Sequence, residues 1–185
     1  VRPFPHGLLF QGWQLAMIVK IISGGQSGVD RAALDAAIKL DIPHGGWVPQ
    51  GRLTEDGPLS EIYALRETPT AVYAERTEKN VVDSDGTLII SRGELTGGSA
   101  YTREMALKHD RPWLHIDLKR TAAFRSAVMI AEWLSANDIR VLNVAGPRAS
   151  KDPNIYRDAA ALLETAYFMS LSALTPKKVQ ESAPS

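Results

Sequence analysis

Most of this chain alternates between two patterns of apolar and polar positions. Short apolar runs at residues 18–22, 87–91, 113–117 and 140–145 have the length of buried strands. Between them, apolar residues recur every three or four positions, as they do on the buried face of a helix. This alternation predicts an α/β sandwich of three layers, with a mainly parallel central sheet of about five or more strands.

Helices are expected at residues 29–40, 74–82, 99–109 and 121–137, and a last helix opens at Asp152-Pro153. Aspartate suits the N-cap there, and proline suits the first helical position. The first helix carries alanine at positions 32, 33, 36 and 37 of its apolar stripe. Because these side chains are small, that helix can lie close to the sheet.

Residues 44–69 depart from this alternation. They are rich in glycine, proline and charged residues, with room for one short strand within residues 45–52 and a long polar loop after it. Loops of that length in a compact domain are usually functional or mobile. We therefore expect this segment to be functional or mobile.

The two ends of the chain differ from its middle. Residues 1–16 combine prolines, glycines and bulky residues without a period, and residues 171–185 are polar. We interpret 1–16 as an N-terminal extension outside the core, 17–170 as one domain and 171–185 as a polar tail. Glycine and glutamine interrupt the apolar residues of the extension, which argues against a signal peptide.

The composition narrows the classes of function. The 185 residues include no cysteine, which excludes disulfides, thiolate metal sites and cysteine nucleophiles. Lys+Arg and Asp+Glu are equal at 21 each, so no global field favours nucleic acid or an anionic membrane. The histidines lack the spacing of metal ligands, and no apolar run approaches the ~20 residues of a membrane span. We expect a cytoplasmic protein with no directly bound metal.

Two glycine pairs, each between a predicted strand and a predicted helix, are the strongest functional signal. The first is Gly24-Gly25, and the second is Gly97-Gly98. Glycine lets a backbone approach an anion closely, and the first N–H groups of the following helix point at that anion. In a parallel sheet both loops, like residues 146–148, meet at the carboxyl edge where ligands bind. We predict a phosphate-like group between the two loops; the alternative is that the glycines only permit tight turns.

Charged pairs open both of the helices that follow these loops. Asp30 and Arg31 begin one helix, and Arg103 and Glu104 lie in the first turns of the other. Arginine suits a ligand phosphate, and a carboxylate suits ribose hydroxyls or acid–base chemistry. The alternatives are a structural acid favoured by the helix dipole at Asp30 and solvated surface charges at Arg103 and Glu104. Trp47, in a glycine-rich loop, either stacks on a ligand ring or packs against the protein.

Several stretches of the chain resemble the putative molybdenum carrier proteins. They are residues 22–35, 43–52, 83–90 together with Asn80, 95–99 and 142–148. The resemblance spans about residues 18–168 and implies a Rossmann-like sandwich, the fold group of the Lonely-guy (lysine decarboxylase-like) phosphoribohydrolases and the DprA-type proteins. The glutamate of the hydrolases' glycine motif falls on Glu104, although residues 96–104 lack that motif's proline, third glycine and threonine.

The resemblance implies a homo-oligomeric binding or carrier protein for a phosphorylated nucleotide- or pterin-like cofactor, with molybdenum cofactor as the family name suggests. One alternative is a nucleotide-processing enzyme similar to the N-glycosidic phosphoribohydrolases, with Glu104 and Arg103 as its catalytic residues. Another is an interaction module that has lost its ligand. The residues expected to bind the cofactor are Gly24, Gly25, Gln26, Ser27, Gly28, Asp30, Arg31, Trp47, Gly97, Gly98 and Ser99.

Overall fold

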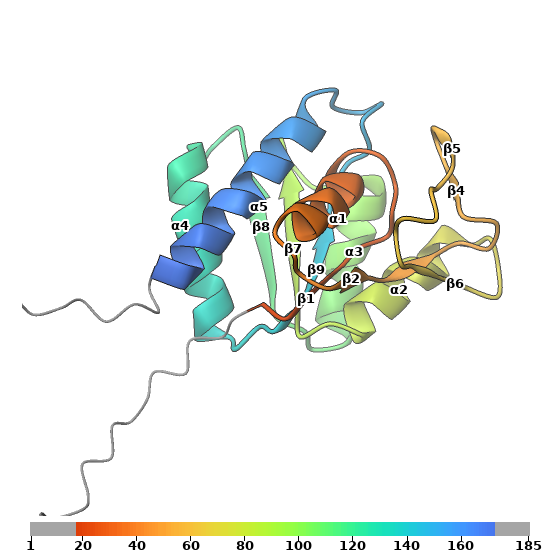
Figure 1. Cartoon of the computed structure of the whole chain (residues 1–185), viewed down its shortest axis with the longest axis horizontal. Coiled ribbons are helices and arrows are strands. Elements are labelled where there is room, and N and C mark those ends of the chain that lie inside the picture. Colours follow the sequence, from red (N-terminus) through yellow and green to blue (C-terminus); the bar gives the residue numbers. More distant parts are fainter. Residues whose placement is uncertain (1–17, 173–185) are drawn as a thin grey trace, which may run out of the picture.

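The computed structural model describes residues 18–172, which form a central sheet of five parallel strands (Figure 1). The strands are β1 (Lys20–Ile22), β2 (His44–Gly45), β7 (Gly86–Ser91), β8 (Trp113–Asp117) and β9 (Val141–Ala145). Every neighbouring pair in this sheet is parallel. The predicted parallel sheet is therefore confirmed. The predicted extension at 1–16 and residues 173–185 of the predicted tail lie outside the described residues.

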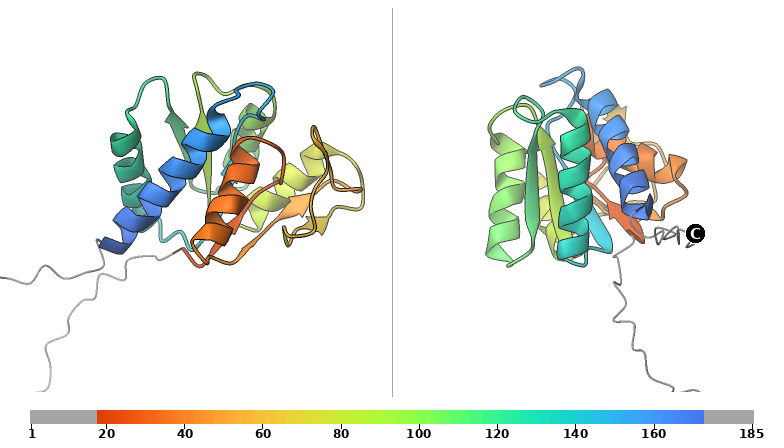
Figure 2. Two further views of the ribbon diagram at one scale, coloured as in Figure 1. Left: turned by 45° about the horizontal axis from the view of Figure 1, so that its top comes forward. Right: turned by 90° about the vertical axis from the view of Figure 1, so that its left-hand side faces the viewer.

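Helices cover both faces of the sheet, as the right-hand view of Figure 2 shows. Helices α1 (Val29–Lys39), α4 (Ala123–Ala136) and α5 (Ile155–Ser172) pack together on one face. Helices α2 (Tyr73–Val82) and α3 (Gly97–Lys108) pack against each other on the opposite face. Every helix expected from the sequence is present, and the Rossmann-like three-layer sandwich is confirmed. Helix α5 begins at Ile155 rather than at the expected Pro153, because the residues before it form a turn closed by the Ile155 N–H and the Asp152 carbonyl, 3.1 Å apart.

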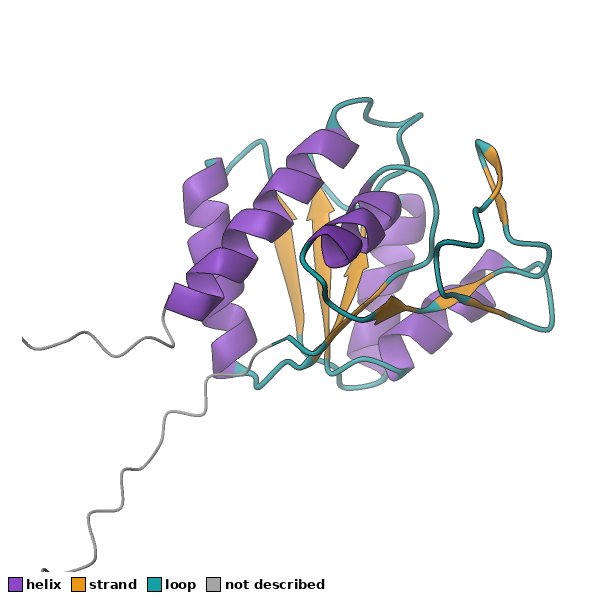
Figure 3. Cartoon of the chain, viewed as in Figure 1, coloured by secondary structure: helices purple, strands orange, loops and turns teal. Residues whose placement is uncertain are grey.

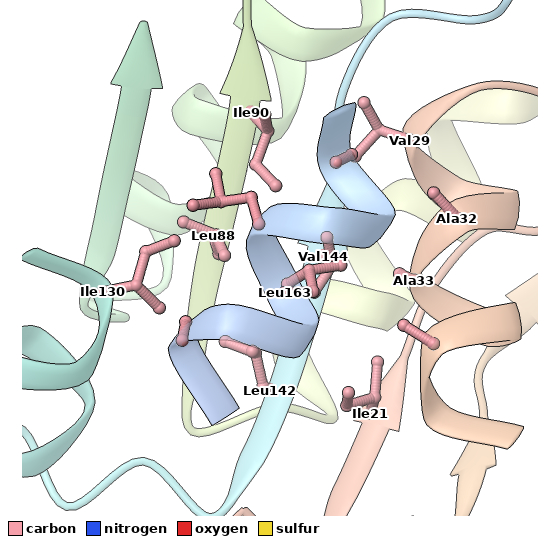
Figure 4. Close-up of a cluster of buried hydrophobic side chains, with 14 of the residues drawn as sticks. Ile21, Val29, Ala32, Ala33, Leu88, Ile90, Ile130, Leu142, Val144 and Leu163 are labelled. Carbon is pink, nitrogen blue, oxygen red and sulfur yellow. The ribbon is translucent and has the colours of Figure 1, made fainter. Parts of the chain in front are cut away.

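The largest apolar cluster fills the space between the sheet and helices α1, α4 and α5 (Figure 4). Leu88 and Leu142 from the sheet and Ile130 from α4 are at most 1% exposed. Burying such a side chain contributes about 1.5–3 kcal/mol. The alanines at positions 32 and 33 of α1 are fully buried, so the predicted close approach of that helix to the sheet is confirmed.

Three of the helices end in the same way, with an aspartate in the left-handed region. Asp41, Asp110 and Asp138 have φ of 55°, 49° and 49° and follow the C-caps of α1, α3 and α4. In each case the next residue's N–H reaches back to the helix, as Ile139 does to the Leu134 carbonyl at 3.0 Å. This is the Schellman arrangement, in which glycine is the usual residue at the left-handed position.

The segment between β2 and α2 has more structure than the single strand and loop that the sequence predicts. It forms two pairs of two-residue strands, drawn mostly as loop in Figure 3: β3 (Trp47–Val48) with β6 (Arg66–Glu67), and β4 (Leu53–Thr54) with β5 (Gly57–Pro58). A second apolar cluster, with Leu59 and Leu65 in it, joins this segment to Leu34 of α1. The Arg52 guanidinium donates to three carbonyl groups of residues 60–65, each at 3.0 Å. Side-chain contacts, rather than a local pattern, therefore order this part of the chain.

The order of the strands across the sheet is β2-β1-β9-β7-β8. The last strand of the sequence thus lies in the centre and pairs with both β1 and β7. If β9 is counted first, the order reads 3-2-1-4-5, which is the order of doubly wound dinucleotide-binding sheets. Chains leave β1 and β9 toward the face of α1 and α5, whereas the chain leaves β7 toward α3 on the other face. A topological switch point therefore lies between β9 and β7.

Within residues 18–172, none of the helices has the length and apolar character required to cross a bilayer.

Candidate functional site

A cavity of about 1060 Å³ opens at the carboxyl edge of the sheet, at this switch point. Its walls come from the loops after β1, β7, β8 and β9 and from the first turns of α2 and α3. Ligands of open α/β sheets bind at such switch points. The volume is slightly above the range of about 300–1,000 Å³ typical of small-molecule sites, so the cavity can hold a ligand of nucleotide size.

The cavity carries more basic than acidic side chains. The arginine and lysine side chains come from helix α2 and from the loops after β7, β8 and β9, so the fold rather than one sequence motif brings them together. The basic residues of the lining are Arg76, Arg92, Lys119, Arg148 and Lys151, and the acidic ones are Asp30, Glu94 and Asp152. Guanidinium and ammonium groups at one concave site favour a ligand with phosphate or carboxylate groups.

The second glycine pair lies in the cavity wall at the start of α3. A Cβ atom added at Gly97 or Gly98 would meet no heavy atom within 4 Å. Thr96, the N-cap, makes no side-chain hydrogen bond to the helix, and α3 has no acidic residue in its first turn. The first N–H groups of a helix lack partners within it. This helix end is therefore open to an anion, and packing against the protein does not explain Gly98.

The first glycine loop is different, because protein groups already fill the space around it. Gly25 and Gly28 have φ of 70° and 78°, and a Cβ at Gly25 would lie 2.7 Å from Leu59 Cδ2. The Ser27 N–H donates to Gln26 Oε1 at 3.0 Å, and the Val29 N–H donates to the Pro147 carbonyl at 3.3 Å. These glycines serve a tight turn and close packing. Of the ligand residues predicted within 24–31, only Gln26 in the loop and Asp30 in α1 line the cavity.

Asp30 and Arg76 form a buried ion pair in the cavity wall. The Arg76 Nη1 atom lies 3.2 Å from Asp30 Oδ2, and the Asp30 side chain is 4% exposed. Burial raises the pKa of Asp30, against the opposing effects of Arg76 and of the backbone N–H groups of Gln26 and Gly146. Arg76 Nε is buried with no partner in the described chain. A Cβ at Gly24 would overlap the Arg76 guanidinium, so Gly24 makes room for this pair.

A serine and a histidine meet at the end of β7. Ser91 Oγ lies 2.8 Å from His115 Nε2 and donates its proton to the Gly93 carbonyl at 2.9 Å. His115 Nε2 is therefore the donor toward Ser91. Burial lowers the pKa of His115, with the charges of Arg103 and Arg120 acting in the same direction and Asp117 opposing them. In this arrangement the imidazole does not accept the Ser91 proton, so the pair is not set up as nucleophile and base.

Trp47 does not line the cavity. Its indole Nε1 donates to Asp83 Oδ2 at 2.8 Å, while its backbone N–H donates to Asn80 Oδ1 at 2.8 Å. The Arg66 guanidinium and the Lys79 ammonium lie 4.1 Å and 4.6 Å from the indole ring centroids. The indole is thus engaged by cations of the protein itself, as in the packing alternative.

The predicted charged residues Arg31, Arg103 and Glu104 also lie outside the cavity lining. The Arg31 guanidinium stacks over the Tyr63 ring at 5.3 Å and reaches the Gly25 carbonyl at 3.5 Å. Arg103 Nε is buried with no hydrogen-bond partner among the described residues, and Glu104 is exposed. Gly97, Gly98 and Ser99 do line the cavity, so the structure brings the second loop together with Gln26 and Asp30.

Several cavity residues were not among the predicted ligand residues. Arg92, Lys119 and Arg148 each lie within three residues of the end of a predicted buried strand. That position is a usable signal, because the carboxyl ends of parallel strands share one edge. Arg76 has no such signal, since it lies in a helix with charged residues on both sides in the sequence.

The fold and the cavity define a Rossmann-like α/β protein with a polar, basic pocket at its switch point. Residues 21–167 match the model of the circularly permutated YpsA SLOG family, and the chain belongs to that family. The permutation agrees with a sheet whose first strand, in the usual order, is the last strand of this chain.

The chain is also similar to a solved structure from Syntrophus aciditrophicus SB, which is called a putative molybdenum carrier protein. The two are 58% identical, with a TM-score of 0.81, over 82% of this chain and 96% of that one. No curated protein matches the chain. Within residues 18–172, no group of three or more acidic or histidine side chains is arranged to hold a metal ion.

Proposed function

We propose that this protein binds and carries a phosphorylated nucleotide- or pterin-like cofactor, with molybdenum cofactor as the leading candidate cargo. The observation that carries the proposal is the basic cavity at the switch point, into which the uncapped start of α3 opens. The name of the Syntrophus protein supports a molybdenum-related cargo. The proposal also includes self-association of the chain into a homo-oligomer.

The lining residues suit both halves of such a ligand. Lys119 and the N–H groups at Gly97 and Gly98 offer positive charge and donors to a phosphate. Arg92 also lines the cavity, but its guanidinium is paired with Asp152 at 2.9 Å and with Asp158. Tyr73 and Tyr101, from α2 and α3, offer aromatic rings to a planar heterocycle. The carrier thus needs only to hold and shield the ligand, with no bond made or broken.

A hydrolytic function has less support from the geometry. Glu104, the residue that corresponds to the glutamate of the phosphoribohydrolases, is exposed and does not line the cavity. A general acid or base must come within hydrogen-bond reach of the group it serves. We therefore favour binding over N-glycosidic hydrolysis.

The test compares two single substitutions in α3. Gly98→Leu adds a side chain where the protein leaves open space, so the free energy of unfolding should stay the same or rise by up to about 1 kcal/mol. The same change should abolish binding of adenosine or guanosine monophosphate, measured by calorimetry. Glu104→Gln, on the same helix but outside the cavity, is the matched control and should bind as the unmodified protein does.

Native mass spectrometry of freshly purified protein, together with molybdenum analysis, addresses the cargo. A retained pterin-like mass with molybdenum supports the carrier. Absence of any retained mass, with no affinity for the monophosphates, molybdate or inorganic phosphate, overturns the proposal. Release of free base that Glu104→Gln abolishes would establish the hydrolase instead.

A further inference from the structure

The tip of the β4–β5 hairpin is bound to the two loops that border the cavity after β1 and β9. The Glu55 carboxylate accepts hydrogen bonds from Ser27 Oγ, from the Ser150 N–H at 3.1 Å and from Ser150 Oγ at 2.5 Å. Arg148 Nε lies 3.8 Å from the same carboxylate. The Glu55 N–H donates to Gln26 Oε1 at 2.9 Å. A side chain at the tip of the β4–β5 hairpin therefore contacts segments 28 and 95 residues away in the sequence.

The groups around the Glu55 carboxylate are also groups from which a phosphate oxygen can accept hydrogen bonds. Two hydroxyl groups, one backbone N–H and one guanidinium converge on a single anionic group, and the Glu55 side chain is only 16% exposed there. Gln26 and Arg148 also line the cavity, so this group of donors lies at the cavity's border. The sequence predicts a phosphate-like group between the loops at residues 24–28 and 97–99. Beside Ser27, in the first of these loops, the structure has a carboxylate of the chain itself.

The hairpin, here residues 51–60, is anchored at its base independently of Glu55. The Arg52 guanidinium donates to the carbonyl groups of Ser60 and Tyr63, and Leu59 is buried in the second apolar cluster. At the tip, Asp56 is exposed, and its N–H donates to Thr54 Oγ1 at 3.3 Å, within the hairpin. The base can thus stay in place while the tip detaches.

We propose that Ser27, Ser150 and Arg148 form an anion subsite which Glu55 occupies in the ligand-free protein, and that a phosphate group displaces Glu55 and frees the hairpin tip. The identity of the phosphate as part of the cargo rests on the proposed function. The hydrogen bonds from Ser150 and Ser27 and the charge of Arg148 hold the pKa of Glu55 below its ordinary value, although burial opposes them. Glu55 is therefore an anion at neutral pH and competes with another anion for the same donors.

The experiment compares Glu55→Ala with Asp56→Ala in the full chain, using inorganic phosphate as the probe. Both variants lose one negative charge at the hairpin tip, but only the first empties the subsite. If the tip is detached about a tenth of the time, removing the competitor should tighten phosphate binding about tenfold. Asp56→Ala should bind phosphate as the unmodified protein does. Hydrogen exchange of the Ser150 amide should accelerate in Glu55→Ala and slow again when phosphate is added.

Each outcome decides the proposal. Equal phosphate affinity in all three proteins, weaker binding in Glu55→Ala, or no acceleration at Ser150 overturns the subsite. If nucleotide binds the unmodified protein and Glu55→Ala shows no gain for phosphate, the subsite fails while the carrier function stands. If the unmodified protein retains no ligand and has no measurable affinity for the monophosphates, molybdate or phosphate, but Glu55→Ala binds phosphate, the carrier function fails while the subsite stands.

Discussion

A single methyl group at Gly24 should break the buried Asp30–Arg76 ion pair in the cavity wall. The added Cβ would overlap the Arg76 guanidinium and lie 2.8 Å from Asp30 Oδ2. Gly24 is not among the glycines with positive φ, so its backbone accepts alanine and the effect comes from the clash alone. Arg76 must move away, and Asp30 then loses its charged hydrogen-bond partner.

The size of the effect follows from what remains in the protein. A lost hydrogen bond to a charged group costs about 1.5–3 kcal/mol, and an ionised carboxylate left buried without its partner costs about 3–5 kcal/mol. Burial already raises the pKa of Asp30, and the loss of Arg76 raises it further. A raised folded-state pKa gives stability that is present below the unfolded pKa and is lost as pH rises through the folded value. Gly24→Ala should therefore be nearly as stable as the unmodified protein in acid and increasingly less stable toward pH 8.

Urea unfolding at several pH values measures this difference directly. Asp30→Asn in the Gly24→Ala background is the control, because it removes the charge that the alanine leaves unpaired. It should abolish the additional pH dependence of stability that Gly24→Ala introduces. Equal unfolding free energies for Gly24→Ala and the unmodified protein at every pH would show that the ion pair contributes nothing. A loss of stability that does not change with pH would assign the effect to packing instead.

Three further outcomes are expected. Leu88→Ala should lower the free energy of unfolding by about 2–5 kcal/mol in denaturant titrations, since Leu88 is fully buried in the central sheet. Burial, and then the hydrogen bond and charge of Asp35, raise the pKa of Tyr63 and of Tyr156 to about 12. The raised pKa values stabilise the folded protein below the unfolded tyrosine pKa of 10, and this stabilisation is lost as pH rises through about 12. Asp35→Asn should therefore shift both phenol titrations to lower pH in the ultraviolet absorbance. Asp138→Gly should raise the thermal midpoint, with a gain of about 0.5–1 kcal/mol, because glycine adopts the left-handed region without strain.

Local patterns predict the elements of this fold well but not how the elements are arranged. The helix over Val29–Lys39 and the strand over Val141–Ala145 follow from periodicity and turn residues, and both are found within a residue or so of their predicted limits. No local feature, however, distinguishes a central strand from one nearer the edge, so the place of β9 comes only from the pairing of the sheet.

The residues of the candidate site also differ in whether a local sequence pattern predicts them. Gly97 and Gly98 could be predicted as cavity residues because their signal is local. Arg76 could not, since its role depends on how α2 packs beside the first glycine loop. Glu55 lies in a loop that the sequence predicts to be functional or mobile, but its partners lie 28 and 95 residues away in the sequence. Contacts of that sequence separation leave no periodic trace in the chain.

The central place of the last strand has a consequence for how the protein is made. A ribosome releases β1 and β2, and later β7 and β8, before β9 has been translated. Those two strand pairs share no hydrogen-bonded edge, because only β9 pairs with both β1 and β7. From the time β8 has been made until β9 follows it, the nascent chain therefore carries two unjoined strand pairs with open edges, and such edges invite association with other chains. The sheet is complete only when β9 pairs with both β1 and β7, and the loop after β9 then completes the cavity wall.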